Sequence, residues 1–134
     1  MAGTLTKVLV IEPDLDVREM IADLFSLTDY HVEPLPEEGD AVAFSERIRP
    51  KVIMIGIRPT IPEDRQIVED LQGNPRTRAI PVVVTSTSEK VVAEAADCAN
   101  VRETLVAPYD LTTLEQAVAT ALGEQPADGG SRCN

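Results

Sequence analysis

The segment Lys51-Val-Ile-Met-Ile-Gly-Ile57 is the most informative part of the chain for the fold, because it is an uninterrupted apolar run bounded by Pro50 and Pro59. A strand that is apolar on both of its faces is typical of the middle of a parallel sheet, where helices cover both sides. We therefore expect a buried central strand here, with further strands beside it.

Strands and helices are predicted to alternate along the rest of the chain. The other apolar, β-branched runs predict strands over residues 7–11, 30–35, 80–85 and 103–106, and apolar residues at three- and four-residue steps predict helices over 15–27, 39–48, 62–71, 86–99 and 112–122. Asp14 is expected to cap the first helix, and the capping boxes Ser86/Glu89 and Thr112/Glu115 are expected to open the last two. Five such units with short connections favour a doubly wound α/β fold, a five-stranded parallel sheet with helices on both faces.

Length and composition indicate one globular domain over residues 5–123, followed by a flexible tail or linker stub over 124–134 that lacks apolar periodicity. No apolar run approaches the roughly 20 residues that span a bilayer, and the first residues lack a signal-peptide pattern, so a cytoplasmic protein without a membrane segment is expected. With 23 acidic against 12 basic residues the formal net charge is −11, which would repel a phosphate backbone and argues against nucleic acid as a partner.

Ligands of open parallel sheets bind outside the carboxyl ends of the strands. That rule selects the loop after the first strand, with Glu12 and Pro13, and the ends of the third, fourth and fifth strands at Gly56, Ser86 and Ala107.

Four segments, at residues 8–18, 50–56, 80–86 and 106–110, resemble in their order and strand contexts the landmarks of bacterial response-regulator receiver domains. The resemblance covers residues 5–123. It implies a flavodoxin-like sheet with strand order 2-1-3-4-5 and a place in two-component signal transduction or a phosphorelay.

The residues at the family's functional positions depart from its pattern. The paired acids that bind Mg²⁺ in receiver domains fall on Glu12 and Pro13, the phosphoryl-accepting aspartate on Gly56, and the lysine that pairs with the phosphoryl group on Ala107. Phosphoryl transfer needs an acceptor oxygen and positive charge to neutralise the equatorial oxygens, and these positions supply neither. We therefore expect a degenerate receiver, or pseudo-receiver, that takes up no phosphoryl group and uses no metal or cofactor.

Two further family positions are a hydroxyl, kept as Ser86, and an aromatic switch residue, replaced by Thr104. For Ser86 the sequence favours a helix cap over a relic of the switch hydroxyl. Arg58 is expected to be an exposed arginine before a proline. The alternative is that it supplies a positive charge near the position of the family's phosphorylation pocket. Tyr109 is expected to pack against the core.

The leading functional hypothesis is a phosphorylation-independent signalling module that acts by protein–protein interaction. By resemblance, its docking face would run from about Glu89 to Leu122, and the partner would be a kinase, an output domain or a second copy in a homodimer. The alternative is a small-ligand sensor that uses the vacated pocket around Glu12, Gly56, Ser86 and Ala107. An enzyme on this fold is the weakest hypothesis, because the sequence offers no nucleophile with a base, glycine-rich phosphate loop or metal cluster.

Overall fold

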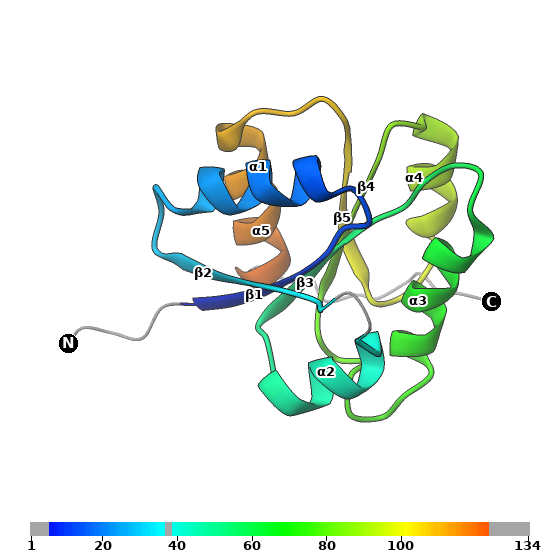
Figure 1. The fold of residues 1–134 in the computed structure, drawn as a ribbon. Coiled ribbons are helices and arrows are strands. Elements are labelled where there is room, and N and C mark those ends of the chain that lie inside the picture. The colour runs from blue at the N-terminus through cyan, green and yellow to red at the C-terminus, as the bar shows by residue number, and fades with distance from the viewer. Residues whose placement is uncertain (1–5, 37–38, 124–134) are drawn as a thin grey trace.

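The computed structural model describes residues 6–36 and 39–123. Its core is a five-stranded sheet in the order β2-β1-β3-β4-β5, in which every neighbouring pair is parallel (Figure 1). The strands are β1 (Thr6–Ile11), β2 (Tyr30–Pro34), β3 (Val52–Gly56), β4 (Val82–Ser86) and β5 (Val101–Val106). This arrangement confirms the predicted fold class, including the strand order.

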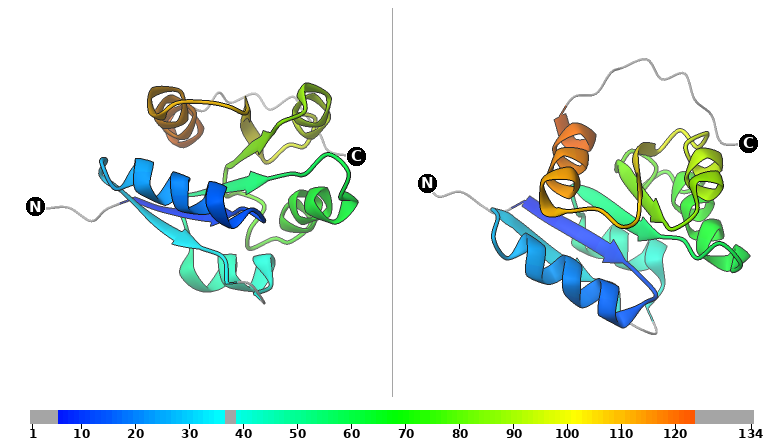
Figure 2. Two further views of the ribbon diagram at one scale, coloured as in Figure 1. Left: turned by 45° about the horizontal axis from the view of Figure 1, so that its top comes forward. Right: turned by 90° about the horizontal axis from the view of Figure 1, so that it is seen from above.

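Helices cover both faces of the sheet (Figures 1 and 2). The helices are α1 (Leu15–Phe25), α2 (Ala41–Ile48), α3 (Pro62–Gln72), α4 (Glu89–Ala95) and α5 (Leu111–Gly123). Buried side chains of α1 and α5 share one apolar cluster, and those of α2, α3 and α4 share the other. The sheet therefore separates two apolar layers, as a doubly wound fold requires.

The alternation of side chains along the strands fills both layers. In β1, Val8 and Val10 belong to the cluster beneath α1 and α5, whereas Leu9 belongs to the opposite cluster. All five residues of β3 are buried, with Ile53 and Met54 on opposite faces. The apolar run around residues 51–57 is thus the central strand that the sequence predicts.

Asp14 caps α1, as the sequence predicts. Its carboxylate accepts hydrogen bonds from the backbone N–H groups of Asp16 and Val17 at 2.9 and 3.3 Å. The helix expected from residue 39 begins at Ala41, with Asp40 in the same capping role.

Both capping boxes predicted for the last helices are wrong. Ser88 caps α4 and accepts the Val91 N–H at 3.2 Å, whereas Ser86 is still the last residue of β4. Asp110, not Thr112, caps α5 by accepting the Thr113 N–H at 2.9 Å. The spacing of a capping box fits several registers, and the extent of strand pairing decides which residue becomes the cap. Helix α4 also ends at Ala95 rather than near residue 99.

The tail predicted over residues 124–134 lies outside the described residues, as does the first residue of the predicted domain. Within the described ranges, no helix is long and apolar enough to cross a membrane.

Candidate functional site

Four of the six predicted site residues meet at the carboxyl edge of the sheet. Glu12, Gly56, Ser86 and Ala107 line a cavity of about 170 Å³, together with other residues that include Tyr109. The ends of β1, β3, β4 and β5 bring these residues together from widely separated positions in the chain.

The other two predicted residues, Pro13 and Thr104, are not among the lining residues of this cavity. Thr104 instead borders a separate shallow hollow beside β5, shared with Val106 and Tyr109. The structure therefore assembles the central part of the predicted site and leaves its two flanking positions outside the cavity.

The Glu12 carboxylate lies directly over Gly56. If Gly56 carried a Cβ atom, the three atoms nearest to it would all belong to Glu12, with the carboxylate carbon only 2.8 Å away. The φ angle of Gly56 lies outside the left-handed region, so the backbone itself does not require a glycine. A longer residue at position 56 would have to displace the Glu12 side chain, which occupies the space beside the glycine.

Glu12 is held in this place by the beginning of α1. Its Oε2 accepts the backbone N–H of Asp14 at 3.1 Å. Burial raises the pKa of Glu12, and the negative charges of Asp14 and Asp64 raise it further against the opposing hydrogen bond from Asp14. The positive charge of Arg18 opposes this shift, so the carboxylate is partly buried among both acidic and basic neighbours, and burial has the largest effect.

A carboxylate that the sequence analysis missed holds the loop after β3. Asp64, in the first turn of α3, is only 6 % exposed. It binds Arg58 through three hydrogen bonds, from the backbone N–H at 2.8 Å, from Nε at 2.8 Å and from a terminal guanidinium nitrogen at 2.9 Å. This hydrogen bonding with Asp64 raises the pKa of Arg58.

The pairing changes the interpretation of Arg58, which the sequence predicted to be simply exposed. Half of its side chain is exposed, but the charged group is bound to Asp64. The available signal was an acid in the first turn of a helix, six residues after an arginine and across a turn with two prolines. That signal is weak, since acids are common in first turns for other reasons.

The hydroxyl groups of the site are also engaged. Ser86 donates to the carbonyl of Ile57 at 2.7 Å and accepts the Ser88 N–H at 3.3 Å, so it braces the loop after β3 rather than capping α4 directly. Tyr109 packs against the apolar layer of α1 and α5, as expected. Burial raises the pKa of Tyr109, and the charge of Glu12 adds to the shift.

The magnesium ion that the fold implies does not fit these residues. Mg²⁺ prefers octahedral oxygen coordination that usually includes one or two protein carboxylates. Pro13 and Gly56 offer no side-chain oxygen, and among the described residues no group of three His, Cys, Asp or Glu side chains converges as a metal site would need.

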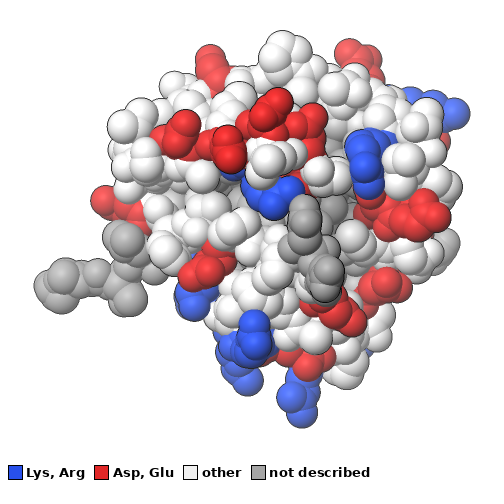
Figure 3. Space-filling view, in the orientation of Figure 1, with Lys and Arg blue, Asp and Glu red and all other residues white. Residues whose placement is uncertain are grey.

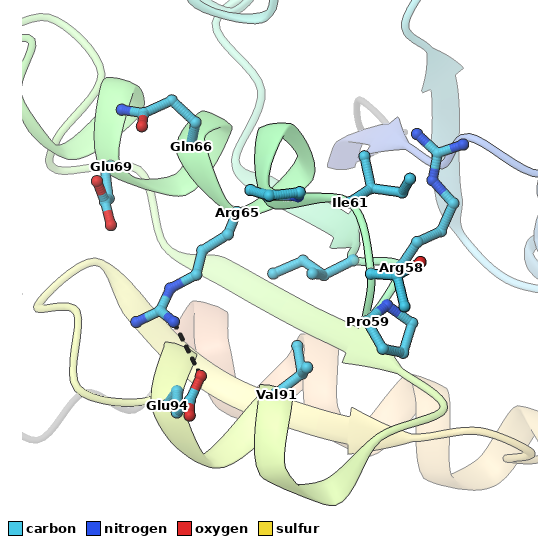
Figure 4. Close-up of a pocket in the computed structure, with 11 residues that line it drawn as sticks. Arg58, Pro59, Ile61, Arg65, Gln66, Glu69, Val91 and Glu94 are labelled. Atoms are coloured by element: carbon cyan, nitrogen blue, oxygen red, sulfur yellow. Dashed lines mark hydrogen bonds and ion pairs between the residues drawn. The ribbon is translucent and has the colours of Figure 1, made fainter.

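A larger hollow of about 400 Å³ lies between α3 and α4 (Figure 4); it shares Ile57, Arg58 and Pro59 with the smaller cavity but is not lined by Glu12, Gly56, Ser86 or Ala107. Arg65 from α3 reaches across it to Glu94 of α4, with 3.0 Å between the paired atoms. We place the site in the smaller cavity, because parallel sheets of this kind bind ligands at the carboxyl ends of their strands.

Comparison with known proteins gives no matching family model and no matching curated relative. Solved structures do match. The receiver domain of the sensor histidine kinase PA1611 from Pseudomonas aeruginosa PAO1, crystallised with a magnesium ion coordinated in its active site cleft, superposes with a TM-score of 0.77 at 17% identity, over 90% of this chain and 100% of that one.

A putative response regulator from Chloroflexus aurantiacus J-10-fl matches with a TM-score of 0.79 at 16% identity, over 90% of this chain and 100% of that chain. The chemotaxis protein CheY4 of Vibrio cholerae matches with a TM-score of 0.74 at 18% identity, over 89% and 100%. At these identities the likeness establishes that the chain has the fold of response-regulator receiver domains.

Proposed function

We propose that this chain is a receiver-like module of two-component signalling that acts through protein–protein contact and does not depend on phosphorylation. The observation that carries the proposal is the end of β3, where Gly56 has no side chain and the Glu12 carboxylate fills the adjoining space. No reaction is assigned to the chain.

A phosphoryl group would meet two obstacles at this edge of the sheet. It needs an acceptor oxygen, which Gly56 cannot supply, and it needs positive charge as its equatorial oxygens develop charge. Ala107 has none, and the guanidinium of Arg58 is already bound to Asp64. Glu12 would instead repel the incoming phosphoryl oxygens.

The proposed docking face consists of α4, β5 and α5. Strand β5 is an edge of the sheet, and Val106 at its end is 37% exposed. Val106 borders the shallow hollow with Thr104, whose small side chain has no ring that could swing between an inward and an outward position. A kinase, an output domain or a second copy of the chain is the partner we expect here. Nucleic acid is not, given the net charge of −11.

Intact-mass spectrometry after incubation with acetyl phosphate and Mg²⁺ tests the phosphorylation-independent part of the proposal. We expect no phosphoryl adduct on the wild-type protein, and none on Gly56→Asp, because Pro13 and Ala107 still leave the metal site and the charge clamp incomplete. A receiver domain with a complete pocket serves as the positive control. Robust labelling of the wild-type protein would overturn the proposal.

Affinity capture from the native cell tests the docking face. Val106→Lys is expected to reduce capture of the specific partner, because it places a charge in the centre of the proposed contact. Leu27→Lys is the matched control, since Leu27 is 75% exposed and lies between α1 and β2, whereas β5 forms the opposite edge of the sheet. Equal capture by both variants would place the contact elsewhere.

The second candidate function, a small-ligand sensor, is favoured by one observation. The cavity at the strand ends persists although Glu12 occupies part of the space beside Gly56.

A further inference from the structure

We propose that the cavity at the carboxyl edge of the sheet binds a small organic cation that carries a primary ammonium group, with the Glu12 carboxylate as its counter-ion. This inference deepens the sensor hypothesis, and it is independent of which face docks a partner. It rests on the charge, the hydrogen-bonding groups and the size of the cavity.

The charges that line the cavity favour a cation. Among the described residues of its lining, Glu12 and Asp14 contribute two carboxylates, and Arg58 contributes the single positive charge. That charge is neutralised by the two hydrogen bonds from its guanidinium to Asp64 at 2.8 and 2.9 Å. Figure 3 shows further acidic side chains gathered over α1, whose first turn borders the cavity. Arg18 of α1 lies outside the lining, and its positive charge lowers the pKa of Glu12 and offsets part of this negative charge. Among the side chains that line the cavity, an anion would still meet net negative charge, because the one cationic group is bound to Asp64.

Among the hydrogen-bonding groups of the cavity, the Glu12 carboxylate is an acceptor that a donating ligand can use. The Ser86 hydroxyl already donates to Ile57, which removes it as a donor for an anion. The bond from Asp14 uses only one oxygen of Glu12, and a carboxylate has about four acceptor sites. An ammonium group brings three donors and can satisfy those sites directly.

An aromatic side chain in the lining adds to the fit for a cation. Tyr109 lines the same cavity as Glu12. The face of a tyrosine ring attracts a cation within about 6 Å. A short alkyl chain on the ammonium group would find Val17 and Ile57 among the lining residues.

The size of the cavity limits the ligand to a few non-hydrogen atoms. Its volume of about 170 Å³ exceeds the roughly 30 Å³ that one water occupies in the liquid, but it is below the roughly 300–1,000 Å³ of sites for drug-sized ligands. A hydrated divalent ion is a poorer occupant, because Mg²⁺ gives up its waters reluctantly and finds little oxygen coordination here.

Ethylammonium is the probe that tests the proposal, and thermal unfolding in ethylammonium chloride is compared with NaCl of the same ionic strength. We expect a rise in Tm that saturates with ethylammonium, together with shifts of the Tyr109 ring signals in the NMR spectrum. Ethanol, the neutral analogue, should produce neither effect. In Glu12→Gln the apparent affinity should fall about tenfold or more. Glu19→Gln, an exposed carboxylate of α1, should bind as the wild type does.

Three outcomes would overturn the proposal. The first is the absence of any saturable effect of ethylammonium on the wild-type protein, and the second is an equal affinity in Glu12→Gln. The third is saturable stabilisation by Mg²⁺ with no response to ethylammonium, which would make the cavity a residual metal site. None of these results bears on acetyl phosphate labelling or on affinity capture, so a failure here is distinguishable from a failure of the docking hypothesis.

Discussion

The contact between Glu12 and Gly56 can be measured directly with a double-mutant cycle. In Gly56→Ala the new methyl group meets the glutamate carboxylate, so the Glu12 side chain must swing away and lose the hydrogen bond from Asp14. In the Glu12→Ala background the three atoms nearest to that methyl group are gone, so the same substitution loses its closest contacts. The two substitutions should therefore be strongly non-additive.

The expected magnitudes follow from three contributions. Replacing a glycine with alanine at a compatible backbone position stabilises a protein by about 0.4–1 kcal/mol through the unfolded state. Loss of the hydrogen bond from Asp14 costs about 0.5–1.5 kcal/mol, and steric crowding adds to that cost. Gly56→Ala should thus be neutral or destabilising with Glu12 present, and it should stabilise the Glu12→Ala variant by about 0.4–1 kcal/mol. The coupling free energy should be about 0.5–1.5 kcal/mol.

Urea denaturation of the four proteins of the cycle supplies this coupling energy. A second cycle that pairs Gly56→Ala with Glu19→Ala is the control, because Glu19 is exposed on α1 and does not approach Gly56. If the Glu12 cycle is additive within about 0.3–0.5 kcal/mol, as distant sites usually are, then the carboxylate does not occupy the space over Gly56. Glu12 would then not obstruct a side chain at position 56.

Three further substitutions test other parts of the molecule. Asp64→Ala should lower stability by about 1–3 kcal/mol in urea denaturation, because it removes the charged acceptor of the part-buried backbone N–H and the guanidinium of Arg58; Glu63→Ala, an exposed acid in the same helical turn, should change little. Because the pKa of Glu12 is raised in the folded state, its ionisation costs stability as the pH rises from about 4.5 through the folded pKa. Glu12→Gln should therefore gain stability relative to the wild type across that window, and a difference that falls with pH would contradict this sign. Asp110→Ala should lower the Tm at neutral pH, whereas Thr112→Ala should leave it nearly unchanged. Because backbone hydrogen bonding lowers the pKa of Asp110, the stabilisation it gives should be lost as the pH falls below about 3.8, and persistence of the difference at lower pH would count against the cap.

The sequence predicted which residues lie at the strand ends better than it predicted the hydrogen bonds that those residues make. Glu12, Gly56, Ser86 and Ala107 each follow a recognisable strand, and the carboxyl ends of parallel strands meet at one edge whatever the details of packing. The hydrogen bonds of Ser86 could not be predicted in the same way, because its partner Ile57 lies 29 residues earlier. The choice between a cap and a brace depended on how far β4 extends along β5.

Asp64 is a second example of a residue whose local structure follows from the sequence but whose binding partner does not. The sequence indicates that Asp64 lies in the first turn of a helix. It does not indicate the pairing with Arg58, because the path of the turn that separates the two residues forms only in the folded chain. The consequence is large, since this pairing neutralises the only positive charge among the described residues that line the cavity.

Apolar periodicity was sufficient to predict the fold class and the order of strands and helices along the chain, and residue identity alone shows that Gly56 has no side chain. These features act over a few neighbouring positions, so they can be recognised without coordinates. The contacts of the site emerged only from the folded chain: the Glu12 carboxylate fills the space over Gly56, Asp64 binds the arginine, and a small cavity remains at the strand ends. Those contacts depend on the distances between strand ends, which form only when the sheet assembles.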